Sequence, residues 1–320
     1  MNIENLLKYN IALSVISFLL SWLIIYAIIP LFRKLLIQIP NVRSSHTKPI
    51  PSGGGIVFVI IGSLFSALLG NFIPLIFLPL AIIGLLDDLF EINKKIRLFA
   101  QILTSILIVY KSTVLEIFSN NTNQFLIILI SITLVVLAVS IINFLNFMDG
   151  LDGLVSSFMV IYLGIFVFSH SPNLLPLLTS ILAFSFWNFP PARIFMGDVG
   201  STFLGGILVA CIFYQKNLGE FIAYFLLASP LLFDALFCLL RRVLSSQEIF
   251  EPHKLHLYQR LHQSGWTHFQ VSFLYCFSTI ILSLTYLFFG INSLIIGSLL
   301  IIPLGIFVDT KYATSFIAEK

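Results

Sequence analysis

Long runs without charge are the feature that most constrains this chain. Six segments contain no Asp, Glu, Lys or Arg: 9–32, 49–86, 117–148, 153–192, 199–215 and 261–308. An apolar helix needs roughly 20 residues to cross about 30 Å of hydrocarbon, so most of these segments can supply a crossing. Among 320 residues, 58% are hydrophobic and 10% are charged, and the mean hydropathy is +1.04. This composition excludes an ordinary soluble globular protein and predicts an all-α, polytopic integral membrane helix bundle.

Two of the charge-free runs are long enough for two crossings each. The run 49–86 has 38 residues and a turn signal at Gly70-Asn71, and the run 261–308 has 48 residues and a turn signal at Gly290-Ile291-Asn292. Both are expected to form helical hairpins. The sequence therefore predicts eleven spans, near 11–32, 53–69, 72–86, 97–110, 125–142, 154–169, 174–188, 201–215, 220–240, 269–289 and 293–309.

The distribution of Lys and Arg predicts the orientation of these spans. With the N-terminus outside, 14 of the 17 Lys and Arg residues lie in cytoplasmic loops, and only Lys8, Lys111 and Lys216 lie outside. Positive residues gather on the cytoplasmic side of membrane proteins, and a wrong number of spans would scatter them over both sides. We therefore expect the C-terminus in the cytoplasm.

A single membrane-embedded domain is expected over residues 1–320. The sequence contains no soluble domain, low-complexity tract or clear internal repeat. Cys211, Cys238 and Cys276 fall inside predicted spans, where thiols are usually small apolar fillers, so no disulfide framework is implied. The first span is too long, and too well bounded by Arg33-Lys34, for a cleaved signal peptide, and we expect it in the mature protein.

Polar chemistry is concentrated in the predicted cytoplasmic loops, near 33–52, 87–97, 143–153, 188–200 and 241–268. Six of the fourteen acidic residues lie in three of these loops: Asp87, Asp88, Glu91, Asp149, Asp152 and Asp198. For a single acid such as Glu91, a solvated loop charge is a sufficient explanation. Asp149 and Asp152 are flanked by apolar runs, where an unpartnered carboxylate is costly. A divalent cation is the natural partner of such a cluster.

The stretch NFLNFMDGLDG (143–153) combines this acidity with a regular spacing. Four polar residues recur at every third position: Asn143, Asn146, Asp149 and Asp152. On one straight helix, at about 100° per residue, the first and last would face opposite directions. Gly150 and Gly153 predict a break, so the series is expected to line a bend at the cytoplasmic end and to converge on a ligand. For Asn143, a hydrogen bond to a neighbouring helix is the alternative.

Two further loops have features of phosphate sites. In GDVGS (197–201), glycines flank Asp198 just before a predicted helix; small residues allow close approach of a ligand, and a helix start favours anions. Lys48 precedes two prolines and three glycines, although the Gly-Lys-Ser/Thr order of a Walker loop is absent. For Lys48, an ordinary basic loop that follows the charge rule is the alternative.

Four of the six histidines lie in one loop: His253, His256, His262 and His268. A zinc site is unsupported by spacing, because no Cys lies in this loop and no HExxH motif is present. With Arg260 nearby, His253 and His256 favour a phosphate or pyrophosphate clamp, and His262 and His268 are expected to be polar loop residues.

Carboxylates for a cation, together with cations and glycines for phosphates, predict phosphoryl transfer between a soluble donor and a lipid acceptor. A membrane transporter or flippase of lipid-linked sugars is the alternative; such proteins place ionisable groups near mid-membrane, often in repeated halves. Here only Asp234 lies well inside a predicted span. Because Arg241 follows Asp234 by two helical turns, we expect these two residues to form a structural pair.

Several motifs occur together in a characteristic order: DD at 87–88 followed by Arg97 and Gln101, NFMDGLDGL at 146–154, FWNFPPARIFMGDVGS at 186–201, and P-x-x-x-D at 230–234 leading to Arg241-Arg242. The chain resembles the polyprenyl-phosphate N-acetylhexosamine-1-phosphate transferases of glycosyltransferase family 4 over nearly its whole length, from Lys48 to the histidine loop. The pattern HKLHLYQRL differs from the run of adjacent histidines in the phospho-N-acetylmuramoyl-pentapeptide transferases. It looks closer to the branch that starts O-antigen-type glycans.

The resemblance implies a role for each matching residue. Asp198 would bind Mg²⁺, with Mn²⁺ as the alternative metal. The catalytic aspartates would be Asp87 and Asp88, which activate or position the polyprenyl phosphate, and Asp149 and Asp152, which bind the nucleotide and complete the site. The substrate-binding residues would be Lys48, Asn146, Asn188 and Arg193, joined by His253 and His256 of the histidine loop.

The resemblance also implies the reaction and its place. A UDP-N-acetylhexosamine, such as UDP-GlcNAc, UDP-FucNAc or UDP-QuiNAc, would give its sugar-1-phosphate to undecaprenyl phosphate in the bilayer, and UMP would leave. The product would start O-antigen-type lipopolysaccharide or a related cell-envelope glycan. The protein would lie in the bacterial inner membrane with a periplasmic N-terminus and a cytoplasmic active site. No nucleic acid partner is expected; homodimer formation, and whether an Asp acts as base or nucleophile, stay open.

Overall fold

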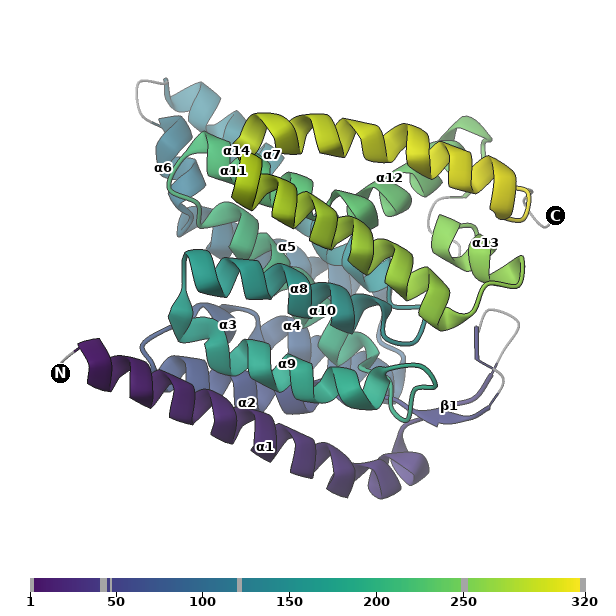
Figure 1. Ribbon diagram of the computed structural model, residues 1–320, viewed down its shortest axis with the longest axis horizontal. Coiled ribbons are helices and arrows are strands. Elements are labelled where there is room, and N and C mark those ends of the chain that lie inside the picture. The colour runs from purple at the N-terminus through teal and green to yellow at the C-terminus, as the bar shows by residue number, and fades with distance from the viewer. Residues whose placement is uncertain (1–2, 41–44, 47, 120–122, 249–252, 317–320) are drawn as a thin grey trace.

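The computed structural model describes residues 3–40, 45–46, 48–119, 123–248 and 253–316. Within these ranges the chain is a bundle of helices that run between two ends of the molecule (Figure 1). The helices are α1 (Ile3–Leu35), α2 (Gly55–Leu68), α3 (Ile73–Ile76), α4 (Leu78–Phe90), α5 (Lys94–Tyr110), α6 (Thr113–Ser119), α7 (Gln124–Phe147), α8 (Leu154–Ser169), α9 (Leu175–Asn188), α10 (Gly197–Phe213), α11 (Leu218–Leu227), α12 (Ser229–Leu244), α13 (Leu257–Gln263) and α14 (His268–Tyr312).

Three short elements complete the described part of the chain. A 3-10 turn covers Pro172–Leu174. Strands β1 (Ile37–Gln38) and β2 (Ile50–Pro51) form an antiparallel ribbon that pairs Ile37 with Pro51 and Gln38 with Ile50. Arg43, Lys320 and parts of the predicted loops 33–52 and 241–268 lie outside the described residues.

Among the described residues, three helices are long and apolar enough to cross a membrane alone: α1 over Lys8–Leu35, α7 and α14. The pair α11 and α12, bent by 72°, adds a fourth if it counts as one span. Helices α2, α8 and α10 are apolar but have only 14, 16 and 17 residues, so they reach about 21 to 26 Å. The prediction of a helical membrane protein is confirmed, whereas the number of spans and their orientation stay predictions.

Each predicted span coincides with a helix or a helix pair. The segment 72–86 forms α3 and α4, the segment 220–240 forms α11 and α12, and the last two segments form α14. The predicted turn in α14 is confirmed, because Gly290 has φ 77° and ψ −172°, and the helix doubles back there (Figure 1). The turn at Gly70 is confirmed as well, with φ 83°.

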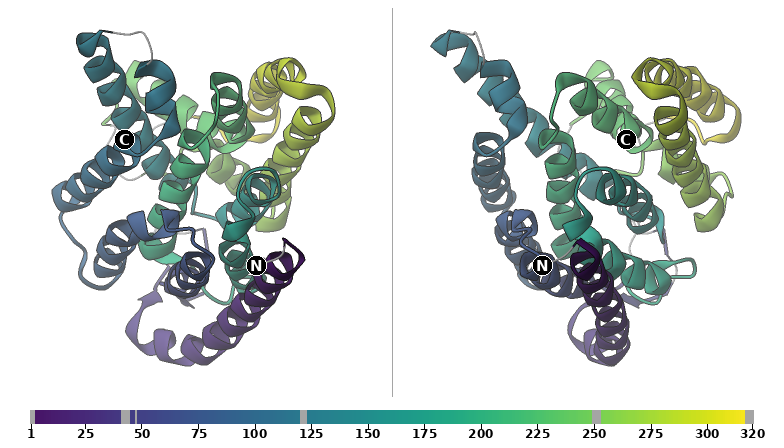
Figure 2. Two further views of the ribbon diagram at one scale, coloured as in Figure 1. Left: turned by 90° about the vertical axis from the view of Figure 1, so that its left-hand side faces the viewer. Right: turned by 60° about the vertical axis from the view of Figure 1, so that its left-hand side comes forward.

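Helix α10 forms the centre of the bundle. All its residues from Val199 to Phe213 are buried, as expected for a helix that is apolar on every side. It packs against α2, α4 and α7, and glycines allow these close contacts; a Cβ atom at Gly205 would lie 2.8 Å from the Cα atom of Ile142. Figure 2 shows α1 (purple) and α14 (yellow) on the outside of the bundle.

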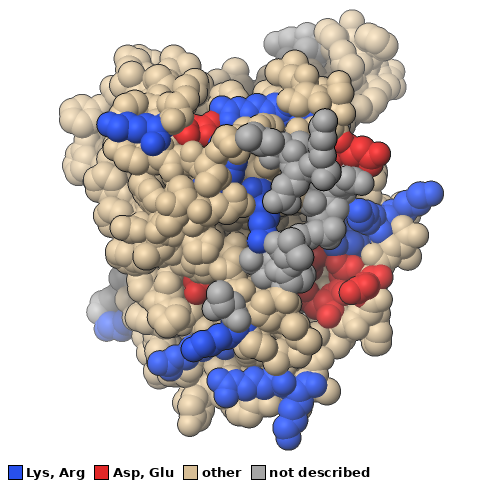
Figure 3. All heavy atoms as spheres, turned by 90° about the vertical axis from the view of Figure 1, so that its right-hand side faces the viewer, with Lys and Arg blue, Asp and Glu red and all other residues tan. Residues whose placement is uncertain are grey.

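The connecting segments gather at the two ends of the bundle. At one end, Asn71 Nδ2 donates to Ser171 Oγ at 2.9 Å, and Asn173 Nδ2 donates to the Leu69 carbonyl at 2.9 Å. The opposite end, which we call the polar end, holds the ribbon β1–β2, the turn 148–153, the segment 189–196 and α13 (Figure 1). Lys, Arg, Asp and Glu side chains gather on its surface (Figure 3).

The packing of α4 against α10 depends on Gly84. A Cβ atom at this position would lie 2.4 Å from the Asp198 carbonyl oxygen, which is fixed in the α10 backbone. Gly84→Ala should therefore lower the thermal unfolding midpoint of the detergent-purified protein, by the equivalent of about 1–3 kcal/mol for an overpacked contact. Gly164→Ala is the control, because its Cβ atom would meet only Leu178, at 4.0 Å. Equal midpoints for the two variants would contradict this account.

Candidate functional site

A polar cavity of about 230 Å³ lies at the polar end. Four parts of the chain line it: the loop after α1 with Gln38, Ser45, His46 and Ser52; the end of α4 with Asp88; the α7–α8 turn with Asn146, Asp149, Gly150 and Leu151; and the segment 188–198 with Asn188, Phe195, Gly197 and Asp198. Gln259 of α13 completes the wall. Five of the eleven predicted site residues thus meet at one cavity, although they come from distant parts of the sequence.

Asp88 is held by the start of α10. Its Oδ1 accepts the backbone N–H of Asp198 at 2.9 Å, and its Oδ2 accepts that of Val199 at 3.2 Å. These N–H groups belong to the first turn of a helix, where no carbonyl is available to accept them. Gly197 has φ +72°, and a Cβ atom there would lie 2.4 Å from Asp88 Oδ2. This helix start does accept an anion, but the anion is a carboxylate of the protein, so a phosphate site at GDVGS stays a prediction.

Arg97 of α5 connects two of the predicted aspartates. Its guanidinium forms an ion pair with Asp87, and a second with Asp198 at 2.7 Å between Nη2 and Oδ2. Asp87 also accepts the backbone N–H of Ile92 at 2.7 Å and does not line the cavity. Arg97 therefore joins α4, α5 and α10 beside the cavity.

Burial changes the acidity of the carboxylates on the cavity wall, all of which lie outside the predicted apolar spans. It raises the pKa of Asp198 to about 7, against the opposing effect of Arg97, and the pKa of Asp88 to about 6. Burial also raises the pKa of Asp149 well above its ordinary value, and the charges of Asp198 and Asp88 add to the effect. Without a metal, burial and mutual repulsion therefore favour the protonated forms of these carboxylates, and a bound cation would favour their charged forms.

The series of polar residues in 143–153 divides into three parts. Asn146 and Asp149 line the cavity, and Ser201 Oγ donates to Asn146 Oδ1 at 3.4 Å. Asn143 instead forms a reciprocal amide pair with Gln101 of α5, with hydrogen bonds of 3.2 and 2.8 Å. For Asn143, the alternative of a hydrogen bond between helices is confirmed.

Asp152, the last member of the series, lies off the cavity wall. Its Oδ2 accepts the Ala192 N–H at 2.9 Å, and its Oδ1 lies 3.1 Å from His268 Nδ1. Burial alone would raise the pKa of Asp152, but the hydrogen bonds from His268 and Ala192 hold it below its ordinary value. Asp152 thus joins the α7–α8 turn to the segment 189–196 and to α14.

His268 and His262 hold the loop that closes the cavity. The Nε2 atom of His268 lies 3.2 Å from the Ser45 carbonyl oxygen, and that of His262 lies 3.3 Å from the same oxygen. Their rings contact each other edge to face, with centroids 4.5 Å apart. The expectation that these two residues are only polar loop residues is wrong, because both fix the loop that carries His46.

Three predicted donor-binding residues have different surroundings. Asn188 is buried; its Oδ1 accepts the Gly153 N–H at 3.1 Å, and its Nδ2 donates to the Ile194 carbonyl at 3.1 Å, so it supports the cavity wall from behind. Arg193 is exposed and lies over the Trp187 ring, 5.5 Å from its centroid. Lys48 is exposed on the loop that carries His46. Neither cation lines the cavity.

His253 and His256 do not line the cavity either. Their rings stack with centroids 5.0 Å apart, and His256 is buried. Burial, with the charges of His256 and Arg242, lowers the pKa of His253 to about 3. A neutral imidazole attracts phosphate only weakly, so donor binding by these histidines stays a prediction. Gln259 is the residue of this region that lines the cavity.

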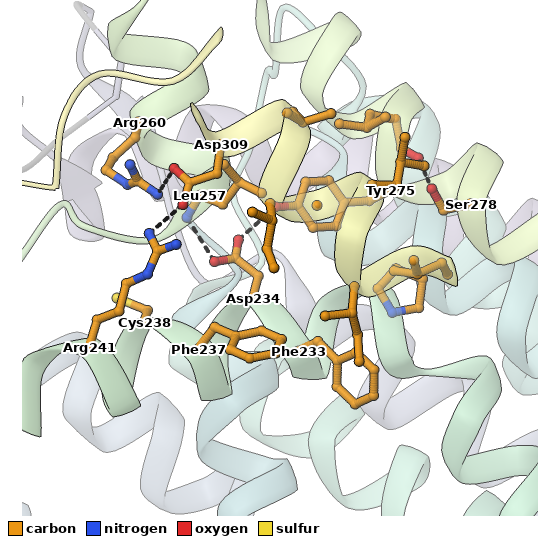
Figure 4. Close-up of a pocket in the computed structure, with 18 of the residues that line it drawn as sticks. Phe233, Asp234, Phe237, Cys238, Arg241, Leu257, Arg260, Tyr275, Ser278 and Asp309 are labelled. Carbon is orange, nitrogen blue, oxygen red and sulfur yellow. Dashed lines mark hydrogen bonds and ion pairs between the residues drawn. The ribbon is translucent and has the colours of Figure 1, made fainter. Parts of the chain in front are cut away.

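Asp234 has a structural role, but with other partners than expected. Its Oδ1 accepts the Leu257 N–H at 2.7 Å, and its Oδ2 accepts the Tyr275 hydroxyl at 2.6 Å, so it fixes the start of α13 to α14 (Figure 4). Arg241 pairs with Asp309 of α14 instead (Figure 4). The predicted pair of Asp234 and Arg241 is wrong, because helical spacing defines a shared face but not the partners on other helices.

The comparisons with known proteins agree with this geometry. The model of glycosyl transferase family 4 matches residues 71–215. A probable undecaprenyl-phosphate N-acetylglucosaminyl 1-phosphate transferase of Bacillus subtilis is 30% identical, with 84% of each chain covered. An undecaprenyl-phosphate alpha-N-acetylglucosaminyl 1-phosphate transferase of Pasteurella multocida is 30% identical with 83% of each chain covered. A phospho-N-acetylmuramoyl-pentapeptide-transferase of Lactococcus lactis is 32% identical, with 49% of this chain and 57% of its own covered. The chain therefore belongs to glycosyl transferase family 4, among the polyprenyl-phosphate N-acetylhexosamine-1-phosphate transferases.

Proposed function

We propose that this protein transfers an N-acetylhexosamine-1-phosphate from a UDP-sugar to undecaprenyl phosphate and releases UMP. The observation that carries the proposal is the cavity with Asp88, Asp149 and Asp198 at one end of an otherwise apolar helix bundle. A water-soluble donor can reach this end, and a lipid acceptor can approach it from the bilayer. The relatives from Bacillus subtilis and Pasteurella multocida are named for transfer to undecaprenyl phosphate, which supports this acceptor.

The carboxylates of the cavity fit a magnesium ion, with Mn²⁺ as the alternative. Mg²⁺ is usually held by one or two carboxylates together with substrate phosphates and water. Asp198 and Asp149 supply carboxylates on the wall, while both oxygens of Asp88 accept backbone N–H groups. We therefore assign Asp198 as a metal ligand with Asp149 beside it. A bound Mg²⁺ would offset the charge of the donor's diphosphate.

The surrounding residues have supporting roles in this proposal. A phosphate oxygen of the acceptor attacks the β-phosphorus of the donor, and the bond to the oxygen shared with the α-phosphorus breaks as UMP leaves. An acceptor phosphomonoester has its second pKa at about 6, so a strong base is not required. Asp87 orients Arg97 and, through it, Asp198. Lys48 and Arg193, exposed on loops near the cavity, are assigned to the donor's diphosphate.

The product would start a lipid-linked glycan of the bacterial cell envelope, of the O-antigen type. This proposal rests on the pattern HKLHLYQRL, and UDP-GlcNAc is the first donor to test because of the names of the relatives. The active site would face the cytoplasm, where nucleotide sugars are made. The transporter or flippase alternative receives no support from the comparisons.

The assignment of Asp198 predicts a loss of turnover. Asp198→Asn should lower kcat about 100-fold or more, because a neutral amide is a poor ligand for a hard cation and charge on the diphosphate is then left unbalanced. UMP release is measured with undecaprenyl phosphate, Mg²⁺ and a panel of UDP-N-acetylhexosamines that begins with UDP-GlcNAc. Glu91→Gln, at the exposed end of α4, is the control and should stay near wild type. Comparable turnover of both variants would remove Asp198 from the site.

The raised carboxylate pKa values predict opposite effects of pH and Mg²⁺ on stability. From an ordinary value of 3.8, the pKa of Asp88 rises to about 6 and that of Asp198 to about 7. Between about pH 4 and 7, these two carboxyl groups bind more protons in the folded state than in the unfolded state. The free energy of unfolding of the metal-free protein should therefore fall as pH rises through this range. Mg²⁺ should then raise the unfolding midpoint more at about pH 8 than at about pH 5. Thermal unfolding followed by fluorimetry, with EDTA or with Mg²⁺, measures the effect of pH and the effect of Mg²⁺ on the midpoint. An Mg²⁺ effect that is unchanged in Asp198→Asn would contradict the assignment of Asp198 as a metal ligand.

His268 is assigned as a positioning residue for the donor. His268→Ala removes the contacts with Ser45 and Asp152, so the KM for the UDP-sugar should rise roughly tenfold, the equivalent of one or two hydrogen bonds. The KM for undecaprenyl phosphate should change much less. His170→Ala, which removes a histidine that contacts Tyr224 and Glu220 at the opposite end, is the control. An equal rise of both KM values would indicate a general structural role for His268 instead.

A further inference from the structure

Three side chains with metal-binding atoms converge beside α12, outside the polar cavity. They are Cys238 of α12 and His253 and His256 of the segment before α13, and one ligand atom of each lies within 4.8 Å of the other two. Cys238 and His256 are buried, and His253 is half-buried. The histidine loop itself contains no cysteine, so this grouping arises only because the fold places α12 against that loop.

His256 has the surroundings of a metal-binding histidine. Its side chain is nearly inaccessible, with 3% of the residue exposed, and among the described residues its Nδ1 atom has no hydrogen-bond partner. That atom lies 3.8 Å from Asp234 Oδ1. Histidines that bind a metal through one ring nitrogen commonly direct the other toward a carboxylate, which fixes the ring and its tautomer. This arrangement leaves Nε2 of His256 as the ligand atom.

Asp234 can orient the His256 ring because its own carboxylate is held in place. Hydrogen bonds from the Leu257 and Tyr258 backbone and from the Tyr275 hydroxyl hold its carboxylate. Figure 4 shows Asp234 between Leu257 and Tyr275, with Cys238 one helical turn further along α12. If Cys238 lost its proton to a bound metal, its thiolate and the Asp234 carboxylate would balance the charge of a divalent ion.

We propose that Cys238, His253 and His256 bind one Zn²⁺ ion. Thiolate and imidazole are the ligands that Zn²⁺ prefers, and three protein ligands with one water molecule complete a tetrahedral site. This donor set differs from the carboxylates of the polar cavity, which suit a hard cation. The ion would fasten the loop before α13 to α12. Since α13 places Gln259 on the cavity wall, the zinc site would stabilise one side of that cavity.

Metal content tests the proposal without any assay of activity. The full-length protein is purified in detergent without chelator, incubated with Zn²⁺ alone, desalted and analysed by mass spectrometry of the elements. Wild type should retain about one zinc per chain, and Cys238→Ser should lose most of it. Cys276→Ser, which changes another buried cysteine on α14, is the control and should retain the ion. Absence of zinc from wild type, or its full retention by Cys238→Ser, would overturn the proposal.

Cobalt gives a second readout that does not depend on the folding of a variant. Co²⁺ bound by a thiolate shows a sulfur-to-metal charge-transfer absorption band, which wild type should display after Co²⁺ replaces Zn²⁺. Absence of the band from wild type would overturn the assignment of Cys238 as a ligand.

A comparison of two variants separates the zinc site from a phosphate clamp. If zinc is bound, His253→Ala and Cys238→Ser should both lose zinc and both lower the unfolding midpoint. If the histidines only bind the donor's phosphates, His253→Ala should raise the KM for the UDP-sugar and leave any zinc in place, and Cys238→Ser should change neither quantity. The second outcome would overturn the zinc proposal and leave the proposed transferase function intact.

Discussion

The hydrogen bonds between the Asp88 carboxylate and the first turn of α10 are the interaction on which the site depends. They join α4 to the central helix of the bundle and satisfy N–H groups at the helix start that would otherwise lack partners. Their geometry requires glycine on both sides of the contact, at Gly84 and at Gly197. The same turn presents Asp198 to the cavity. The Asp88 carboxylate therefore fixes the helix start, and the Asp198 carboxylate, paired with Arg97, lies on the cavity wall.

The helices could be predicted from the sequence because charged residues and turn signals bound the apolar segments, whereas the short elements could not. The ends of α8 agree with the predicted span, and the turn at Gly290 was marked by its residue type. The ribbon β1–β2 and α13 are too short for periodicity to indicate them, and they form only because other elements contact them. The 72° bend between α11 and α12 falls at Ser229-Pro230, a turn signal inside a stretch, 221–233, that carries no charge and therefore favours one continuous span.

The candidate site could be predicted only as far as charge and spacing carry information. Asp149 and Asp152 stood out because carboxylates flanked by apolar runs need partners, and Asp198 stood out because glycines flank it at a helix start. Of the three, Asp149 and Asp198 line the cavity. The ion-pair partner of a charged residue could not be predicted. Arg241 pairs with Asp309, a residue of α14 that spacing along α12 cannot indicate. His268 resembled any polar loop residue in sequence, and its importance comes from its distance to Ser45, which only the folded chain defines.

The amide pair of Gln101 and Asn143 fixes the register of α5 against α7, and with it the position of Arg97. Its two hydrogen bonds are mutual, so a slide of α5 along α7 by even one residue would break both bonds and leave the buried Gln101 amide without its partner. Arg97 lies one turn before Gln101 on the same helix. The amide pair thereby fixes the position of the Arg97 guanidinium along the helix axis relative to Asp198. If the proposed function holds, fit to donors of different size would fall to the loops around the cavity and not to the helices beneath them.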